Sequence, residues 1–337
     1  MSFIKNKKTF IIAEIGNNHE GSYKNALNLI KAAKKTGVDA VKFQTFIPNF
    51  YSDPNNFERI KLLKKFQLSF EQFKRLKKIA NKMGLVFIST PFDLLCAKFL
   101  KKNSDFIKIS SGDNNFTHLI HETIKSYKKI IISTGLMNDK EIKKTYNMLI
   151  AKFGKKRIEN KLAILHCVTD YPVANKFANL NRIQRLIKYF NKKKITIGYS
   201  DHTLGNEACI AAVTLGAKII EKHFTLNKNF SSFRDHKISA DRNEMTQLVK
   251  SIRKIEEMLS SKKTFNIQDP ETKNIKMMRK QPFAIKDLKK GKTLNISNIK
   301  FLRPSRPIKP INLDNILGKK LKKNIYKDQI ILNKDIH

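Results

Sequence analysis

The chain has 337 residues, a hydrophobic content of 41 % and a formal net charge of +40 at pH 7. This length accommodates one large domain and one small domain, and the hydrophobic content is enough for a substantial core. No apolar run reaches the roughly 18 residues of a membrane span, so no membrane partner is expected. Three cysteines, Cys96, Cys167 and Cys209, are too few for a disulfide framework. We interpret them as small core residues of a protein in the reducing cytoplasm.

The positive charge does not by itself indicate a nucleic-acid partner. Lysine is spread from end to end and far outnumbers arginine, and the chain contains no tryptophan. Proteins that recognise specific nucleic-acid sequences favour arginine and interleaved aromatic side chains. We therefore interpret most of the charge as solvated, lysine-rich helix faces, and we expect no nucleic acid as a partner. A basic protein that binds nucleic acid or carbohydrate stays open as an alternative from a different class.

Eight apolar runs of strand length each end in polar or small residues, and helical patterns often follow them. They lie at residues 9–16, 40–45, 85–91, 106–112, 129–135, 162–169, 196–202 and 218–224. Amphipathic spacing is clear at 25–35 and 73–83, with Gly37 and Gly84 where helix C-caps are expected. Eight strand–helix units favour a closed (β/α)8 TIM barrel over an open sheet. We assign this α/β barrel to residues 1–260, with its last helix at 242–259.

The other segments are less regular. Residues 46–69 show no clear regular structure, which is typical of a functional lid or a disordered loop, and a second long connection covers 226–241. Residues 261–278 are polar and irregular and are expected to form a linker. Residues 279–337 predict a small β-rich domain with a weak repeat that aligns 287–299 with 324–336. Such a domain is too small for a large core, so we expect it to lean on the barrel or on that of a second subunit.

Polar side chains at the strand ends predict an active site, because a barrel of this kind builds its site at the carboxyl ends of its strands. Lys42 and Lys108 interrupt apolar strands, where an unpaired buried cation is costly. They either snorkel outward or form an inward pair. We favour an inward pair that, with the hydroxyls of Thr90, Ser111 and Ser133, binds a small dianion. A helix that follows Ser133 is expected to add donors.

Two histidines, His202 and His223, stand at the ends of consecutive strands, each near a carboxylate, Asp201 or Glu221. The segment between them is helical, so the strands are parallel neighbours and both imidazoles reach one edge. The alternative is two satisfied core histidines. The matched pair favours a divalent metal with open positions, acting as a Lewis acid. The sequence does not separate Mn²⁺ from Zn²⁺ or Mg²⁺. His19, His166 and His236 are weaker candidates for function.

The motifs together resemble the sialic acid synthase family, whose members make N-acetylneuraminate and related nonulosonic acids. The resemblance covers nearly the whole chain and rests on residues 12–21, 41–45, 89–93, 108–111, 133–135, 165–172, 198–203, 221–224 and 235–239. The family condenses phosphoenolpyruvate with an N-acetylated sugar aldehyde and releases phosphate. The final segment resembles the family's antifreeze-protein-like (SAF) domain.

The resemblance implies a role for each matching residue. It implies Mn²⁺ on His202 and His223, and catalytic roles for Glu14, Glu221, Lys42 and Lys108. It implies that phosphoenolpyruvate is bound by Lys42, Gln44, Thr90, Lys108, Ser111, Ser133 and Ser200. It implies that the acceptor sugar is bound by Asp170, Tyr171, Glu221, Asp235 and Arg303. Arg303 would reach the site of a partner subunit, which implies a domain-swapped homodimer.

The chain departs from the family pattern in two loops. Ser232-Phe-Arg234 stands where the family often has Gly-Pro, and Arg303 precedes Ser305-Arg-Pro-Ile-Lys-Pro310 rather than a glycine-containing turn. Arg306 is therefore a second candidate for the role of Arg303. The acceptor stays open between N-acetylmannosamine and a 2,4-diacetamido-trideoxyhexose that gives a legionaminate-type product. A related enzyme with a sugar-phosphate product would need a further cationic site.

Overall fold

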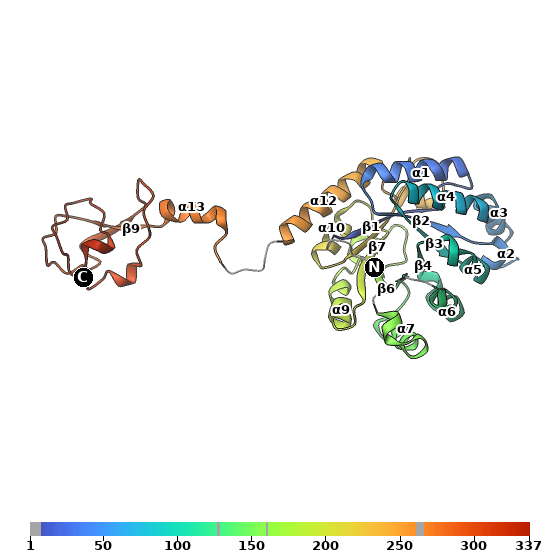
Figure 1. Ribbon diagram of the computed structural model, residues 1–337. Coiled ribbons are helices and arrows are strands. Elements are labelled where there is room, and N and C mark those ends of the chain that lie inside the picture. Colours follow the sequence, from blue (N-terminus) through green and yellow to red (C-terminus); the bar gives the residue numbers. More distant parts are fainter. Residues whose placement is uncertain (1–7, 127–128, 160, 261–265) are drawn as a thin grey trace. The chain divides into compact units, whose positions relative to one another are not determined.

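Eight parallel strands close into a barrel in sequence order, with β1 paired to β8 (Figure 1). Their bounds are β1 Phe10–Gly16, β2 Ala40–Thr45, β3 Val86–Pro91, β4 Phe106–Ile109, β5 Ile130–Ser133, β6 Leu162–Cys167, β7 Thr196–Asp201 and β8 Ile219–His223. The predicted TIM barrel and all eight predicted strands are confirmed. Several predicted runs extend past the strand at its carboxyl end, because the mostly polar and small residues at their ends belong to the turns that follow.

This computed structural model describes residues 8–126, 129–159, 161–260 and 266–337, in two compact units, Met1–Ser261 and Lys262–His337. Within these ranges no helix is both long and apolar enough to cross a membrane.

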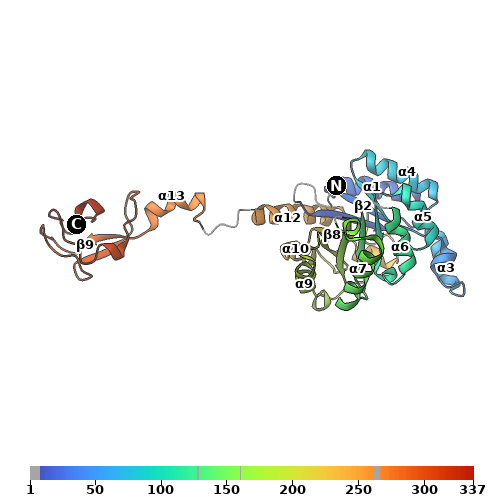
Figure 2. The same cartoon turned by 60° about the horizontal axis from the view of Figure 1, so that its bottom comes forward.

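Helices surround the barrel on its outside (Figures 1 and 2). They are α1 Tyr23–Thr36, α4 Phe70–Lys82, α5 Leu94–Asn103, α6 Thr117–Ser126, α7 Asp139–Phe153, α8 Lys155–Ile158, α9 Asn181–Phe190, α10 Glu207–Thr214 and α12 Arg242–Ser260. Side-chain caps fix several starts; Ser22, for example, accepts a hydrogen bond from the Asn25 amide. The predicted ends at Gly37 and Gly84 are confirmed by positive φ angles of 86° and 77°.

Strand alternation divides the barrel wall into two faces. Outward side chains pack on the helices in the main core, whereas the inward side chains Ile12, Ala40, Ile88, Ile131, Ala163, Leu165 and Ile219 form a separate inner cluster. The next inward positions toward the carboxyl ends carry Glu14, Lys42, Thr90, Ser133, Cys167 and Glu221. The interior of the barrel is therefore filled by a layer of aliphatic side chains, followed toward the carboxyl ends by a layer of mostly polar side chains.

The two long connections contain helices that the sequence pattern did not predict. The segment after β2 holds α2 Pro48–Tyr51 and α3 Phe57–Phe66, and the segment after β8 holds α11 Arg234–Ile238. Helix α3 buries only Leu63 and Phe66, so its apolar face is too narrow for clear helical periodicity. The expectation of an irregular loop at 46–69 is thus wrong.

The second compact unit contains the antiparallel pair β9 Gln281–Ala284 and β10 Ile299–Leu302, preceded by α13 Asp269–Met278. Helix α13 occupies much of the expected linker 261–278, whose residues 261–265 lie outside the described residues. The weak repeat is reflected in the core of this unit. Its matching apolar positions, Leu288, Leu294 and Ile299 with Ile325, Ile331 and Ile336, all lie in this unit's core.

Candidate active site in the barrel

A cavity of about 1030 Å³ is lined by residues at the carboxyl ends of the strands and in the loops that follow. Most of the predicted site residues line it: Glu14, Lys42, Gln44, Thr90, Lys108, Ser111, Ser133, Tyr171, Ser200, His202, Glu221, His223 and Asp235. Most come from different strands, where alternation points them inward, and the others, Ser111, Tyr171, His202 and Asp235, come from the segments that follow strands. Neighbours from α2, α3 and the loop after β8 form the mouth.

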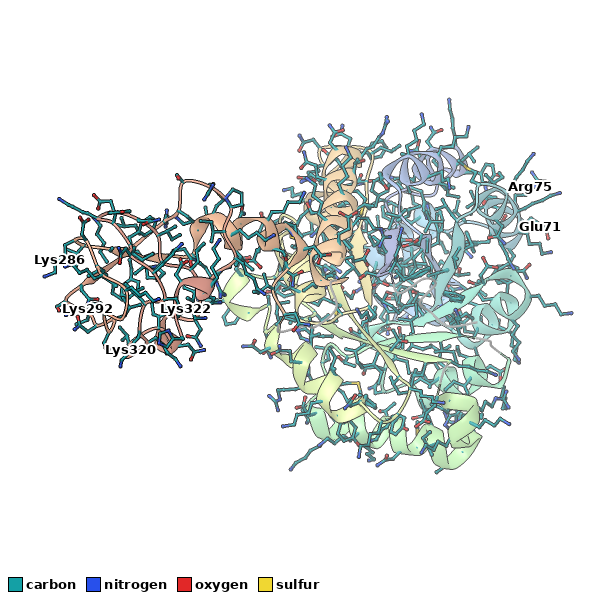
Figure 3. The ribbon with its side chains drawn as sticks, turned by 60° about the vertical axis from the view of Figure 1, so that its left-hand side comes forward. Glu71, Arg75, Lys286, Lys292, Lys320 and Lys322 are labelled. Atoms are coloured by element: carbon teal, nitrogen blue, oxygen red, sulfur yellow. The ribbon has the colours of Figure 1, made fainter. Side chains whose placement is uncertain are left out.

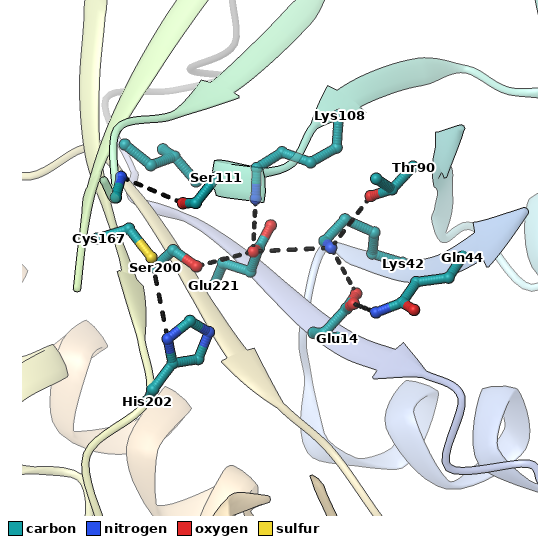
Figure 4. A network of polar contacts seen from close by, with 12 residues as sticks. Glu14, Lys42, Gln44, Thr90, Lys108, Ser111, Cys167, Ser200, His202 and Glu221 are labelled. Carbon is teal, nitrogen blue, oxygen red and sulfur yellow. Dashed lines mark hydrogen bonds and ion pairs between the residues drawn. The ribbon is translucent and has the colours of Figure 1, made fainter. Parts of the chain in front are cut away.

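Two buried lysines are paired with two buried glutamates at the centre of the cavity (Figure 4). The Lys108 ammonium lies 2.6 Å from Oε1 of Glu221, and the Lys42 ammonium lies 2.8 Å from Oε2 of Glu14. Lys42 also lies 3.7 Å from Glu221 Oε1, which accepts a hydrogen bond from Ser200 Oγ at 2.9 Å. Both lysines therefore point inward, and the outward alternative is wrong.

The two glutamates have different protonation behaviour. Burial acts to raise the pKa of Glu221, but Lys108 and Lys42 outweigh it and lower this pKa to about 2. Burial raises the pKa of Glu14; Lys42 offsets this only in part, and the negative charge of Glu221 adds to the rise. Glu221 is therefore a fixed anion, while Glu14 is the carboxyl group that exchanges a proton more readily.

The predicted hydroxyl groups line the same cavity as the lysines. Thr90 Oγ1 lies 3.5 Å from the Lys42 ammonium, and Ser111 Oγ accepts from the Gly135 amide at 3.1 Å. Ser133 Oγ is buried and makes no hydrogen bond within the described part of the chain, so it has capacity for a ligand. The expected helix N-terminus beside Ser133 is wrong, because α7 begins only at Asp139, where Asn138 caps it.

The two candidate metal ligands lie together, with ring centroids 5.5 Å apart. Nδ1 of His202 lies 2.8 Å from the Val168 carbonyl oxygen; a carbonyl only accepts, so Nδ1 carries a proton and Nε2 is the ring nitrogen left to bind a cation. Nδ1 of His223 is buried and has no hydrogen bond among the described residues. Burial, and then the charges of His202 and Lys42, lower the pKa of His223 well below its usual value. This pair fits a divalent cation.

Protein groups supply only part of such a cation's coordination. The described ranges contain no cluster of three or more His, Cys, Asp or Glu residues arranged for a metal ion. Asp201, expected near the metal, instead binds Lys222 on the outer face of the wall at 2.6 Å. Water or substrate would therefore fill the remaining positions.

The sequence pattern missed several cavity residues. Cys167, interpreted as a core residue, lines the cavity, and its sulfur lies 3.9 Å from Nδ1 of His202. Its inward position follows from alternation with Leu165, which is the signal that would have found it. Tyr51 and Arg59 belong to the mouth but lie on helices that were not predicted.

Two of the predicted acceptor-binding residues, Asp170 and Arg303, are exposed. Asp170 is exposed and accepts a hydrogen bond from the amide of Tyr171 at 3.0 Å, so it does not face the cavity. Tyr171 does, with its ring centroid 4.1 Å from that of His202. Arg303 is exposed on the second unit, and its role stays a prediction.

Comparison with known proteins gives two family matches. The NeuB family model matches residues 29–264, and the SAF domain model matches residues 283–337. The chain is 37 % identical to N,N'-diacetyllegionaminic acid synthase of Campylobacter jejuni, over 96 % of this chain and 99 % of the relative. It is 30 % identical to human N-acetylneuraminate-9-phosphate synthase, over 96 % of this chain and 91 % of the relative. The crystal structure of N-acetylneuraminic acid synthetase from Leptospira borgpetersenii superposes with a TM-score of 0.72 and 33 % identity, over 80 % of this chain and 90 % of that one.

Proposed function

We propose, from the premise that this chain belongs to the NeuB family, that it joins phosphoenolpyruvate to an N-acetylated amino sugar beside a divalent cation. Family membership makes it an enzyme that condenses phosphoenolpyruvate with an amino sugar and releases phosphate, giving a nonulosonic acid. The observation that carries the proposal is the buried pair Lys42 and Lys108 next to His202 and His223 in one cavity.

The lysine side of the cavity binds phosphoenolpyruvate. The ammonium groups of Lys42 and Lys108 neutralise the phosphate and carboxylate charges. Thr90, Ser111 and Ser133 donate hydrogen bonds, and Ser133 has no competing hydrogen bond among the described residues. Because these groups are already buried and oriented, little reorganisation opposes binding.

The histidine side binds the acceptor. Mn²⁺, or Mg²⁺ or Zn²⁺ in its place, held by His202 and His223 would polarise the aldehyde carbonyl. Tyr171, beside His202, and Asp235, at the mouth, are placed to bind the sugar. In this arrangement the aldehyde carbon faces C3 of phosphoenolpyruvate.

The reaction then proceeds in two stages. A bond forms between C3 of phosphoenolpyruvate and the aldehyde carbon, and the aldehyde oxygen takes a proton. Water adds to C2 and loses a proton; the bond between C2 and the phosphate oxygen then breaks, and the proton of the new C2 hydroxyl group passes to the leaving phosphate, which leaves a 2-keto acid and inorganic phosphate. We assign the proton transfers to Glu14, because its raised pKa suits exchange, whereas Glu221 remains an anion that holds Lys108.

The charges at the mouth favour an acceptor without phosphate. A sugar phosphate would need a further free cation. Lys65 lies 3.6 Å from Glu20 and Arg234 lies 3.4 Å from Asp235, so both are already paired. Arg59 lies 5.4 Å above the ring of Tyr51 and keeps its charge there, but a single cation balances only half the charge of a phosphate dianion. We therefore propose N-acetylmannosamine or a 2,4-diacetamido-trideoxyhexose as the acceptor.

The test is phosphate release from phosphoenolpyruvate with each of these two sugars and with N-acetylmannosamine 6-phosphate. We expect release with an unphosphorylated acceptor, abolished by a chelator and restored by Mn²⁺. No release with any of the three would overturn the assigned reaction. Phosphate release that persists after chelation would exclude a role for the cation. Preference for the phosphorylated sugar would overturn the proposed acceptor.

The proposal extends to assembly and location. We propose a domain-swapped homodimer in which Arg303 of each subunit serves the other subunit's cavity. The three cysteines are free thiols, which fits the cytoplasm as the place of action.

A further inference from the structure

A buried ion pair that the reaction does not use lies behind the two histidines. Strand alternation points Ser200 and Glu221 into the cavity, where they are hydrogen-bonded at 2.9 Å. The next residues, Asp201 and Lys222, are register partners across β7 and β8. They point to the opposite face, where Asp201 meets Cys209 of α10. Their side chains are 0 % and 2 % exposed.

Both members of this pair make several hydrogen bonds. The Lys222 ammonium donates to Asp201 Oδ2 at 2.6 Å and to the Thr203 carbonyl at 2.8 Å. Oδ1 of Asp201 accepts from the Tyr199 hydroxyl at 2.9 Å and from the amide and hydroxyl of Thr203 at 2.9 and 2.8 Å. The thiol of Cys209 adds a contact to Oδ2 at 3.3 Å. Few alternative arrangements are open to a buried carboxylate held in this way.

The contacts lie on both sides of His202 and on one side of His223 in the chain. Asp201 precedes His202 and Thr203 follows it, and the amide and carbonyl of Thr203 are both bound by the pair. Lys222 precedes His223, whose carbonyl oxygen accepts from the Ala240 amide at 2.8 Å. The pair therefore fixes the backbone on both sides of His202 and on one side of His223.

We infer that Asp201 and Lys222 are positioning residues for the divalent-cation site: without touching the ion, they set the separation and direction of the His202 and His223 rings. This inference rests on the proposed cation site. The alternative is a purely structural role, in which the pair only links β7 to β8 and stabilises the fold. The two explanations predict different cation affinities for variants of the pair that remain folded. A positioning role predicts weakened affinity, whereas a purely structural role predicts the affinity of the wild type.

The experiment measures Mn²⁺ binding to the full-length chain without substrates, from the electron paramagnetic resonance signal of free Mn²⁺. The variants are Asp201→Asn and Lys222→Met, at a temperature where circular dichroism shows each to be folded. Loss of groups that orient metal ligands typically weakens metal binding by about 10- to 100-fold, and we expect a change of that size. Tyr199→Phe removes one hydrogen bond to Asp201 without changing any charge, and should weaken binding by several-fold.

Two controls separate this inference from its premise. Asp39→Asn breaks a half-buried ion pair with Arg253, 3.3 Å away at the amino ends of the strands, and should lower stability without changing Mn²⁺ affinity. His202→Ala should abolish the site. If His202→Ala binds Mn²⁺ like the wild type, the proposed cation site itself is wrong.

Our inference is overturned if His202→Ala loses Mn²⁺ binding while folded Asp201→Asn and Lys222→Met retain wild-type Mn²⁺ affinity. The pair would then have only a structural role. Should both charge variants fail to fold, Tyr199→Phe decides between the two readings. Unchanged Mn²⁺ affinity in that variant overturns the positioning role, and weakened affinity supports it.

Discussion

At the scale of single residues, the two central glutamates show how neighbours assign different tasks to one side-chain type. Glu221 Oε1 contacts two ammonium groups and a hydroxyl, whereas Glu14 contacts one ammonium and Gln44, at 3.4 Å. The first environment stabilises the anion strongly and the second less so. The sequence alone left the proton-transfer group undecided between the two, and the contacts now favour Glu14.

Glu14→Gln is expected to lower kcat by about 10²- to 10⁴-fold, the usual contribution of a general acid–base group. The KM for phosphoenolpyruvate should change little, because both lysines remain. Steady-state phosphate release measures both constants. Glu71→Gln, on the exposed surface of α4 (Figure 3), is the control. Unimpaired turnover in Glu14→Gln would exclude Glu14 from proton transfer.

His19, a weaker candidate for function, is buried against Phe43, with ring centroids 6.0 Å apart. Burial lowers the pKa of His19 from 6.5 to about 4. The unfolded chain thus takes up this proton near pH 6.5 and the folded chain only near pH 4. The contribution of His19 to the free energy of unfolding is therefore fully present above pH 6.5 and is lost as the pH falls toward 4.

The loss should amount to about 3 kcal/mol in the free energy of unfolding. Urea unfolding between pH 4 and pH 8 measures it. His19→Gln should show a shallower decline than the wild type, while His118→Gln, an exposed position on α6, should follow the wild type. Parallel declines in His19→Gln and the wild type would contradict this prediction.

At the scale of elements, α3 is held over the cavity mouth by specific contacts. Phe46, Leu63 and Phe66 form a small buried cluster, and the Phe66 ring meets that of Phe233 with centroids 5.0 Å apart. Gly21, with a φ of 79°, approaches the Lys65 carbonyl so closely that an added Cβ would lie 1.9 Å from its oxygen. The loop after β1 therefore sets where α3 ends.

Gly21→Ala should displace α3 and raise the acceptor KM by about tenfold, since misplacement of about 1 Å can cost far more. The KM for phosphoenolpyruvate should stay within about twofold of the wild type, because its lysines lie on β2 and β4. Gly37→Ala is the matched control: its φ is 86°, but its Cβ would meet only Val249, at 3.4 Å. Equal changes in both KM values would show that α3 does not act on the acceptor alone.

At the scale of the whole molecule, the net charge is a surface property. Among the described lysines only Lys42, Lys108, Lys129 and Lys222 are buried. Lysines of the second unit such as Lys286, Lys292, Lys320 and Lys322 point outward (Figure 3). This distribution agrees with solvated faces.

The proposed domain swap can be tested by complementation. Arg303→Ala and His202→Ala should each be nearly inactive alone. If Arg303 serves the partner's cavity, each mixed dimer has one intact site, so refolding equal amounts together should recover roughly a quarter of wild-type activity. No recovery would place Arg303 in the cavity of its own chain, and an active Arg303→Ala variant would place it outside the site. Repeating the test with Arg306→Ala distinguishes the two arginines.

The amino-acid sequence by itself determined the eight strands, the barrel and most of the cavity residues. Strand periodicity and the common direction of parallel strands are local properties, and together they bring strand ends to one edge. The motif resemblance then supplied the roles proposed for those residues.

Only the tertiary structure decided which groups pair. Asp201 and Glu221 each precede a histidine by one or two residues in the sequence, yet Asp201 faces α10 and Glu221 faces the cavity. The pairing of Lys108 with Glu221 and the helix α3 over the mouth likewise depend on contacts between residues far apart in the chain. Such contacts determine how deeply each side chain is buried and which charges lie beside it. Burial and neighbouring charges in turn determine the protonation of each group and the geometry of the ligand site.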